Sequence, residues 1–255
     1  MLLKVFPMND PQPPERPPAR NYDTPIMVVV GILAFFGIAF VLLPGTGHPR
    51  SVSYRMQSTN NLKQIGLALH NYHDMYGELP PAYIVDENGR PLTSWRVLLL
   101  PLLEQKALYD QFDLDAPWDS PTNLPLVQQM PQIYTSPYFY GTQSQGRTPY
   151  LGIVDAIDGG TILRPGKGRT MKEVADGPSN TAMVIDDPGR MVIWTKPDDI
   201  DPLELLTMVP WDQNDLHGIL VLRGDVSVQH LSEQERAQLV GLIFCDDGRI
   251  PKTAP

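Results

Sequence analysis

The stretch RMQSTNNLKQIGLALHNYHDMYGELPPAY, residues 55–83, decides the fold because it holds one long amphipathic helix followed by its stop signals. Five apolar side chains recur at spacings of three and four and form one stripe: Leu62, Ile65, Leu69, Tyr72 and Tyr76. Gly77 and the pair Pro80–Pro81 end the periodic pattern. The spacing predicts a helix over 51–76, and its apolar stripe requires a partner surface such as a sheet.

The composition excludes several classes of protein. The 255 residues include 27 Pro and 20 Gly, and this argues against a mostly helical chain because Pro ends helices. The formal net charge of −9 supplies no basic face for phosphates, so we expect no nucleic-acid partner. Cys245 is the single cysteine and cannot form an intramolecular disulfide.

Residues 25–44, PIMVVVGILAFFGIAFVLLP, contain no charged side chain. As a helix, an apolar run of this length spans a bilayer core of ~30 Å. A cleaved signal peptide is the alternative, but a Pro-rich tail, residues 1–24, precedes the run. We therefore predict an uncleaved transmembrane helix over 25–44, a disordered tail over 1–24 and a hinge over 45–50.

The second half of the chain is rich in strand signals. TAMVID, 181–186, and MVIWT, 191–195, flank the turn DPGR and predict one hairpin. GILVLRGDVSVQHL, 218–231, predicts a second hairpin that turns at 223–225. Ser232 and Glu235 form a capping box at the start of a short helix.

The segment between the first helix and these hairpins is irregular. A turn is expected at 86–91, followed by one or two helical turns from residue 95, a break at Pro101 and an amphipathic helix to about Phe112. The fold class expected is α+β, with the long helix packed across an antiparallel sheet and long Pro-rich loops. This domain covers 51–250, and 251–255 form a tail.

Residues 60–83 resemble the start of the soluble part of a bacterial family of pseudopilin-like proteins that is abundant in planctomycetes; their sequence is NNLKQIGLALHNYHDMYGELPPAY. Members of this family carry a domain of unknown function. The likeness continues through SWRVLLLPLLEQKALYDQFDLDAPWDSP, NLPLVQQMPQIY, ADGPSNTAMVID and IWTKPDD, and covers most of 42–248. The resemblance implies a pilin-like fold in the bacterial envelope and implies no particular chemistry.

Two family features differ in this chain. YDTPIMVVVGIL heads the apolar run without the Glu of a prepilin leader, so we expect a single copy that does not polymerise. The family's C-terminal His-x9-Asp-Gly signature is altered, because seven residues separate His217 from Asp225 and Val226 stands in place of Gly. No role of that signature is therefore carried over.

His70, His73 and Asp74 have the i, i+3, i+4 spacing that can place three ligands around Zn²⁺. The alternative is structural, because histidines near a helix C-terminus bond the last carbonyls and favour the dipole. We favour this structural interpretation.

Four further groups of residues have both a functional and a structural interpretation. In the segment 176–181, Ser179 could be a nucleophile. The alternative is a turn, because the segment consists largely of typical turn and cap formers: Asp176, Gly177, Ser179, Asn180 and Thr181. Arg223, Gly224 and Asp225 form an adhesion tripeptide or a plain turn. The acidic loops could bind Ca²⁺ or be solvated turns; they contain Asp155, Asp158, Asp198, Asp199 and Asp201. The tryptophans could stack on sugars or pack a core; they are Trp95, Trp118, Trp194 and Trp211.

The function expected is a structural or interaction protein of the bacterial envelope, anchored by a single pass in the inner (cytoplasmic) membrane with its C-terminal domain outside the cytoplasm. Its partners would be the lipid bilayer and envelope proteins, and we expect no enzyme activity, cofactor or metal. The alternative is an anchored ligand-binding, metal-binding or hydrolytic domain. An exposed apolar patch favours the first, and convergence of His70, His73 and His217 favours the second.

Overall fold

The computed structural model describes residues 29, 49–135, 137, 145–155, 157, 160–207 and 218–245. The chain divides into two compact units, Met1–Gly47 and His48–Pro255. In the first unit only Val29 is described, so the tail 1–24, almost all of the span 25–44 and most of the hinge 45–50 lie outside the described residues. Among the residues described, none of the helices combines the length and the apolar character needed to cross a membrane.

The dominant helix of the second unit is α2 (Pro49–Tyr76), 28 residues long. It begins two residues earlier than predicted, so Pro49 and Arg50 belong to the helix and not to a hinge. Proline is well tolerated in the first turn of a helix, because the backbone N–H groups there have no intrahelical partner. The helix ends as predicted at Gly77, whose φ of 82° is left-handed and whose N–H donates to the His73 carbonyl at 2.7 Å.

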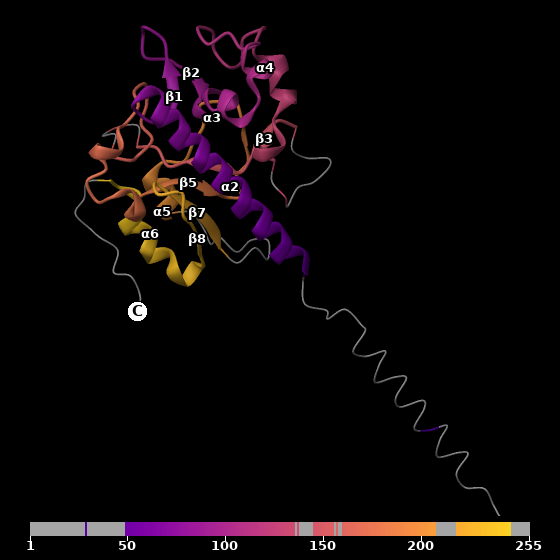
Figure 1. Cartoon of the computed structure of the whole chain (residues 1–255), viewed down its shortest axis with the longest axis vertical. Helices are drawn as coiled ribbons and strands as arrows, with labels where there is room; N and C mark the ends of the chain where they lie inside the picture. The colour runs from indigo at the N-terminus through magenta and orange to yellow at the C-terminus, as the bar shows by residue number, and fades with distance from the viewer. Residues whose placement is uncertain are drawn as a thin grey trace, which may run out of the picture. The chain divides into compact units, whose positions relative to one another are not determined.

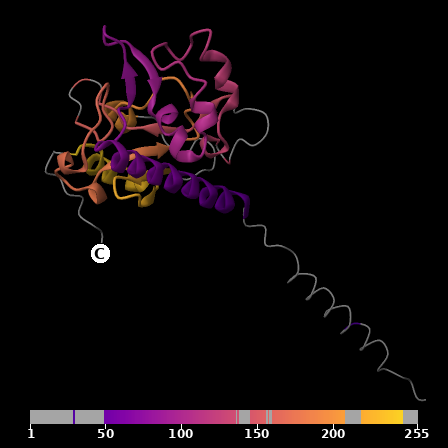
Figure 2. The same ribbon diagram turned by 45° about the horizontal axis from the view of Figure 1, so that its top comes forward.

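An antiparallel sheet in the order β4-β5-β7-β8 forms the centre of this unit. Its strands are β4 (Tyr150–Gly152), β5 (Ala182–Asp186), β7 (Ile219–Arg223) and β8 (Val228–Leu231). Helix α2 packs across β5, β7 and β8, as Figures 1 and 2 show. The α+β class and the helix across an antiparallel sheet are therefore confirmed.

The sheet is covered on both faces, and this explains the continuous apolar run of β7. Leu220 and Leu222 join the cluster that contains Leu62, Ile65 and Leu69 of α2. The alternate β7 residues join a second cluster with the helices α5 (Pro202–Thr207) and α6 (Arg236–Ile243). A strand buried on both faces has no polar alternation, since neither side meets water.

A close approach fixes α2 against the β7–β8 turn. A Cβ added to Gly66 would lie 2.9 Å from Cγ1 of Val226 and 3.0 Å from Cδ1 of Leu222. Glycine in the middle of this helix is thus required by the packing of the turn, although it lowers helix propensity. Val226 itself has a left-handed φ of 68°, the conformation that a Gly at this position would adopt without strain.

The hairpin predicted at 218–231 is confirmed, since β7 pairs with β8 in antiparallel register. The hairpin predicted at 181–195 is wrong. Strand β6 (Val192–Ile193) pairs with β3 (Arg147–Thr148), and β5 does not pair with it. Both edges of β5 are already occupied by β4 and β7, so the chain after Asp186 must leave that sheet.

The segment between α2 and β3 contains short elements. Strands β1 (Tyr83–Val85) and β2 (Pro91–Ser94) flank the predicted turn. They are followed by α3 (Trp95–Leu98), η1 (Leu100–Leu103), α4 (Lys106–Tyr109), η2 (Leu124–Gln129) and η3 (Gln132–Tyr134). The helix predicted to about Phe112 is only one turn long and ends at Tyr109, and Phe112 packs edge-on against Trp194.

Three short 3₁₀ helices follow β4 in the described part of the chain. They are η5 (Met171–Glu173), η6 (Pro178–Asn180) and η7 (Glu233–Glu235). Half of the capping box predicted before the last helix is present, because the Glu235 carboxylate accepts the Ser232 N–H at 3.0 Å. The Ser232 hydroxyl donates to the same carboxylate at 2.7 Å, and the Glu235 N–H donates to the Ser232 carbonyl.

A candidate binding groove beside helix α2

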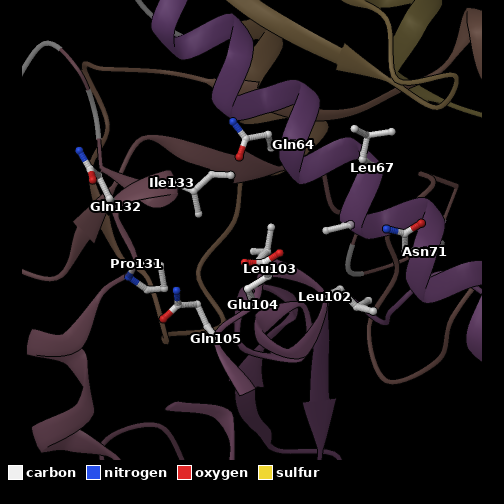
Figure 3. A pocket seen from close by; sticks show the side chains of 11 residues that line it. Gln64, Leu67, Asn71, Leu102, Leu103, Glu104, Gln105, Pro131, Gln132 and Ile133 are labelled. Atoms are coloured by element: carbon white, nitrogen blue, oxygen red, sulfur yellow. The ribbon is translucent and has the colours of Figure 1, made fainter. Parts of the chain in front are cut away.

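An open groove of about 460 Å³ lies beside α2, on the flank of the helix next to η1 and η3. Its walls come from three separate parts of the chain, as Figure 3 shows. Helix α2 supplies one wall with the i, i+3, i+4, i+7 set Gln64, Leu67, Ala68 and Asn71. The other walls are residues 102–105 and 131–133.

The lining of the groove mixes apolar side chains with uncharged carboxamides. Leu67 is 55% exposed, and Met56, Met75 and Tyr76 elsewhere on α2 are exposed to a similar degree. Leu102, Leu103, Pro131 and Ile133 add apolar surface opposite it. The polar lining consists of four carboxamides and one carboxylate: Gln64, Asn71, Gln105, Gln132 and Glu104.

Glu104 owes its position in the groove to an unusual backbone conformation. It follows η1 with φ 58° and ψ 23°, the left-handed region, and its N–H donates to the Leu100 carbonyl. Glycine is the usual residue at such a helix end, because a side chain is unfavourable there. A glutamate at this position holds a carboxylate in the groove at a cost in backbone energy.

The predicted candidates His70, His73 and Asp74 lie at the end of α2 and serve other contacts. His70 Nε2 lies 2.7 Å from the Gly224 carbonyl oxygen in the β7–β8 turn. His73 Nε2 accepts the Met171 N–H at 3.4 Å, and its Nδ1 lies 3.6 Å from the Asp74 carboxylate. The histidines therefore join α2 to two other segments instead of bonding its last carbonyls, so that part of the prediction is wrong.

No metal cluster is formed by the parts of the chain that the structure describes, since no three His, Cys, Asp or Glu side chains there are placed to hold one ion. His217, the third histidine of the hydrolytic or metal-binding alternative, lies outside the described residues.

The segment 176–181 forms the predicted turn. Gly177 has φ 87°, the Asn180 amide donates to the Asp176 carbonyl at 2.9 Å, and the Thr181 hydroxyl donates to the Gly177 carbonyl at 3.1 Å. The Ser179 carbonyl accepts the Arg223 guanidinium at 2.8 Å. Each of these contacts is structural.

The tripeptide 223–225 likewise forms a turn, and its charged side chains bind neighbouring residues. Besides Ser179, the Arg223 guanidinium binds the Gln229 side chain at 2.8 Å. The Asp225 carboxylate accepts the Ser227 N–H at 2.9 Å. The turn extends to Ser227, whose carbonyl accepts the Arg223 N–H at 2.9 Å.

Three of the acidic-loop residues hold turns or local ion pairs. Asp155 accepts the Ile157 N–H at 3.0 Å, Asp201 caps α5 through the Leu203 N–H at 2.8 Å, and Asp198 pairs with Lys196 at 2.9 Å. Asp158 lies outside the described residues.

Asp199 is not the solvated turn residue that was expected. Its side chain is 3% exposed and pairs with the fully buried Arg96, with Nη2 and Oδ1 2.6 Å apart. The same oxygen accepts the Gly152 N–H at 2.7 Å and the Trp95 indole N–H at 3.2 Å. The remaining Arg96 nitrogens donate to the Tyr150 carbonyl and the Ser94 hydroxyl. A buried charge pair of this kind is stable because each ion keeps several hydrogen-bond partners.

A second buried carboxyl group has no signal in the local sequence pattern. Asp186 ends β5 beneath α2, where the Ser58 hydroxyl donates to its Oδ2. Ser58 also lies 3.0 Å from the Tyr150 hydroxyl, which accepts the Asn61 amide at 3.0 Å. Burial raises the pKa of Asp186 to about 7, with a smaller contribution from the charge of Asp187.

Two of the tryptophans pack the core. Trp95 and Trp194 are fully buried, and the Trp194 indole donates to the Val127 carbonyl at 2.9 Å. Trp118 is partly buried, and Trp211 lies outside the described residues. None of the three described rings lines the groove.

A long helix against an antiparallel sheet, with an irregular segment forming a groove at its side, defines an α+β domain whose best candidate site is a binding surface. Residues 48–150 match a family described as a protein of unknown function (DUF1559). The match contains α2 and every residue that lines the groove. Comparisons with curated proteins and with solved structures gave no significant match.

Proposed function

We propose that the chain is a membrane-tethered interaction protein of the bacterial envelope, and that the groove beside α2 is the site where its domain binds a partner protein. The observation that carries this proposal is the groove itself, which gathers the exposed Leu67, further apolar side chains and four carboxamides in one concavity. A concave surface that combines apolar side chains with convergent polar groups is typical of a binding site.

Catalysis is a weaker interpretation of the same groove. Among the described residues that line it, Glu104 alone is ionisable, so these residues offer no nucleophile paired with a base. The buried carboxyl groups of Asp186 and Asp199 are engaged beneath α2 and with Arg96 instead. The volume of the groove would also admit a small molecule, and this occupant is an outcome of the tests below.

The tether is the uncharged run 25–44, which is long enough to span a bilayer. We place this anchor in the inner membrane with the domain outside the cytoplasm. The resemblance to planctomycete pseudopilin-like proteins supports this placement, and the missing leader glutamate supports a single copy that does not polymerise.

Affinity purification of the full-length chain from solubilised membranes tests the partner site. The wild type, Leu67→Asp and the matched control Met56→Asp are compared, because Leu67 and Met56 are exposed residues of one helix and only Leu67 lines the groove. We expect a protein that copurifies with the wild type and Met56→Asp but is lost from Leu67→Asp. Equal recovery with both variants would contradict the proposal.

Extraction of native membranes with alkaline carbonate tests the tether. The full-length chain should stay in the pellet, since a spanning helix resists removal that strips peripheral proteins. A soluble product that begins after residue 44 would show instead that the apolar run is a cleaved signal.

A further inference from the structure

We infer that the groove binds an extended polypeptide segment whose Lys or Arg side chain lies opposite Glu104. This inference rests on the proposed function, since it takes the groove as the partner site and names the chemistry of its occupant.

The charge of the Glu104 carboxylate favours an occupant with a cationic side chain. The carboxylate is exposed and forms no hydrogen bond or ion pair within the described part of the chain. Its backbone has the left-handed conformation that favours glycine. An unpaired charge held at a strained position in a groove complements a cation on the occupant.

The carboxamide side chains of the lining favour an occupant with peptide groups. Gln64, Asn71, Gln105 and Gln132 line the groove on both of its sides. None of them forms a side-chain hydrogen bond within the described residues. Each carboxamide can both donate and accept, as a peptide group does.

An extended chain satisfies these amides better than a helix does. The backbone N–H and C=O groups of a helix bond one another, whereas those of an extended segment are available to a binding surface. The lining also holds the apolar side chains of Leu67, Leu103 and Ile133, which suit the side chains that alternate along such a segment.

Other polymers fit the lining poorly. Sugars and single-stranded nucleic acids are recognised largely by stacking on aromatic rings, and the described residues that line the groove include no aromatic side chain. Nucleic acids also require cations, whereas the charge present here is that of Glu104.

The inference is tested by binding labelled nonapeptide libraries to the full-length protein in detergent micelles. Three libraries share random flanks of Leu, Ala, Ser and Thr and differ only in a central Lys, norleucine or Glu. Fluorescence anisotropy gives the affinity of each library for the wild type, Glu104→Gln, Glu104→Lys and the control Glu87→Gln, whose exposed carboxylate lies in the β1–β2 turn.

We expect the Lys library to bind about two- to fivefold more tightly than the norleucine library, as an exposed charge pair permits. Glu87→Gln should keep this preference, Glu104→Gln should lose it, and Glu104→Lys should prefer the Glu library. The same Lys preference in Glu104→Gln, or none in the wild type, would overturn the inference.

The two proposals fail in different ways. If the libraries bind without a preference for Lys while Leu67→Asp still loses its protein partner, the occupant named here is wrong and the partner site stands. If Leu67→Asp keeps its partner, the groove is not the partner site and both proposals fall.

Discussion

Asp199 shows how one residue can hold distant parts of this chain together. Its carboxylate receives the Arg96 guanidinium, the Gly152 N–H and the Trp95 indole N–H, and it joins the start of α3 to β4. Asp199→Asn would leave the fully buried guanidinium without its counter-ion. We predict a loss of about 3–5 kcal/mol in the free energy of unfolding, measured by urea denaturation.

Asp115→Asn is the matched control, because Asp115 is exposed. It should change the free energy of unfolding by less than about 0.5 kcal/mol. A loss below about 1 kcal/mol for Asp199→Asn would mean that the pair behaves like a surface ion pair.

Glu104→Gly tests whether the left-handed backbone at residue 104 lowers the stability of the fold. Because glycine adopts φ 58° without strain, the exchange should raise the free energy of unfolding by about 0.5–1 kcal/mol. Glu87→Gly is the control, since the φ of Glu87 is not positive and the same exchange there should destabilise. Thermal unfolding of both variants checks this, and a lower melting temperature for Glu104→Gly would refute the account of strain at this residue.

At the scale of elements, the contact between α2 and the sheet should depend on pH through Asp186. Its pKa is about 7 in the folded protein and 3.8 when unperturbed, so the folded state binds its proton more tightly. The protonated Asp186 carboxyl group therefore stabilises the folded state, and this contribution is fully present below the unfolded pKa of 3.8. The contribution is lost as the pH rises from about 4 to about 7. The neighbouring Asp187, whose pKa burial also raises, acts in the same direction.

Urea unfolding at pH 5 and pH 8 measures this effect. At about 1.4 kcal/mol per pKa unit, the two units between pH 5 and the folded pKa should make the wild type about 3 kcal/mol less stable at pH 8, and Asp186→Asn should flatten the difference. A slope that is equal in both proteins would show that Asp186 does not titrate in this window.

The apolar stripe of α2 gives a separate prediction. Leu69→Ala should lower the free energy of unfolding by about 2–5 kcal/mol, since Leu69 is fully buried against the sheet. His70→Ala removes one contact with the Gly224 carbonyl and should cost only about 0.5–1.5 kcal/mol. Denaturation with and without a chelator checks both, and stabilisation by added Zn²⁺ that is lost in His70→Ala would establish a metal site instead.

These elements also show what the sequence could predict. The α2 stripe and the β7–β8 hairpin rest on local spacing: Leu62, Ile65 and Leu69 are buried as predicted, Tyr76 of the same stripe is exposed, and the hairpin is present. The partner of β5 depends on which strand edges remain free, and the Arg96–Asp199 pair joins positions 103 residues apart. Local patterns carry no information on such contacts, and the groove was missed for the same reason because three separate segments form it.

At the scale of the whole molecule, an uncharged run would hold the chain at a membrane, and the domain that follows has a groove at the side of α2. A tether confines the domain to a surface and raises the effective concentration of any partner in the same membrane, so even a weak contact in the groove is enough for association.

Site-specific photo-crosslinking in native membranes tests this central claim most directly. A photoreactive phenylalanine analogue replaces Leu67 in the groove or, as a control, Met56 outside it, in the full-length chain. The account predicts a crosslinked protein from position 67 that is absent from position 56, with the crosslinked peptide of the partner containing Lys or Arg. Equal crosslinking from both positions, or none from position 67, would contradict it.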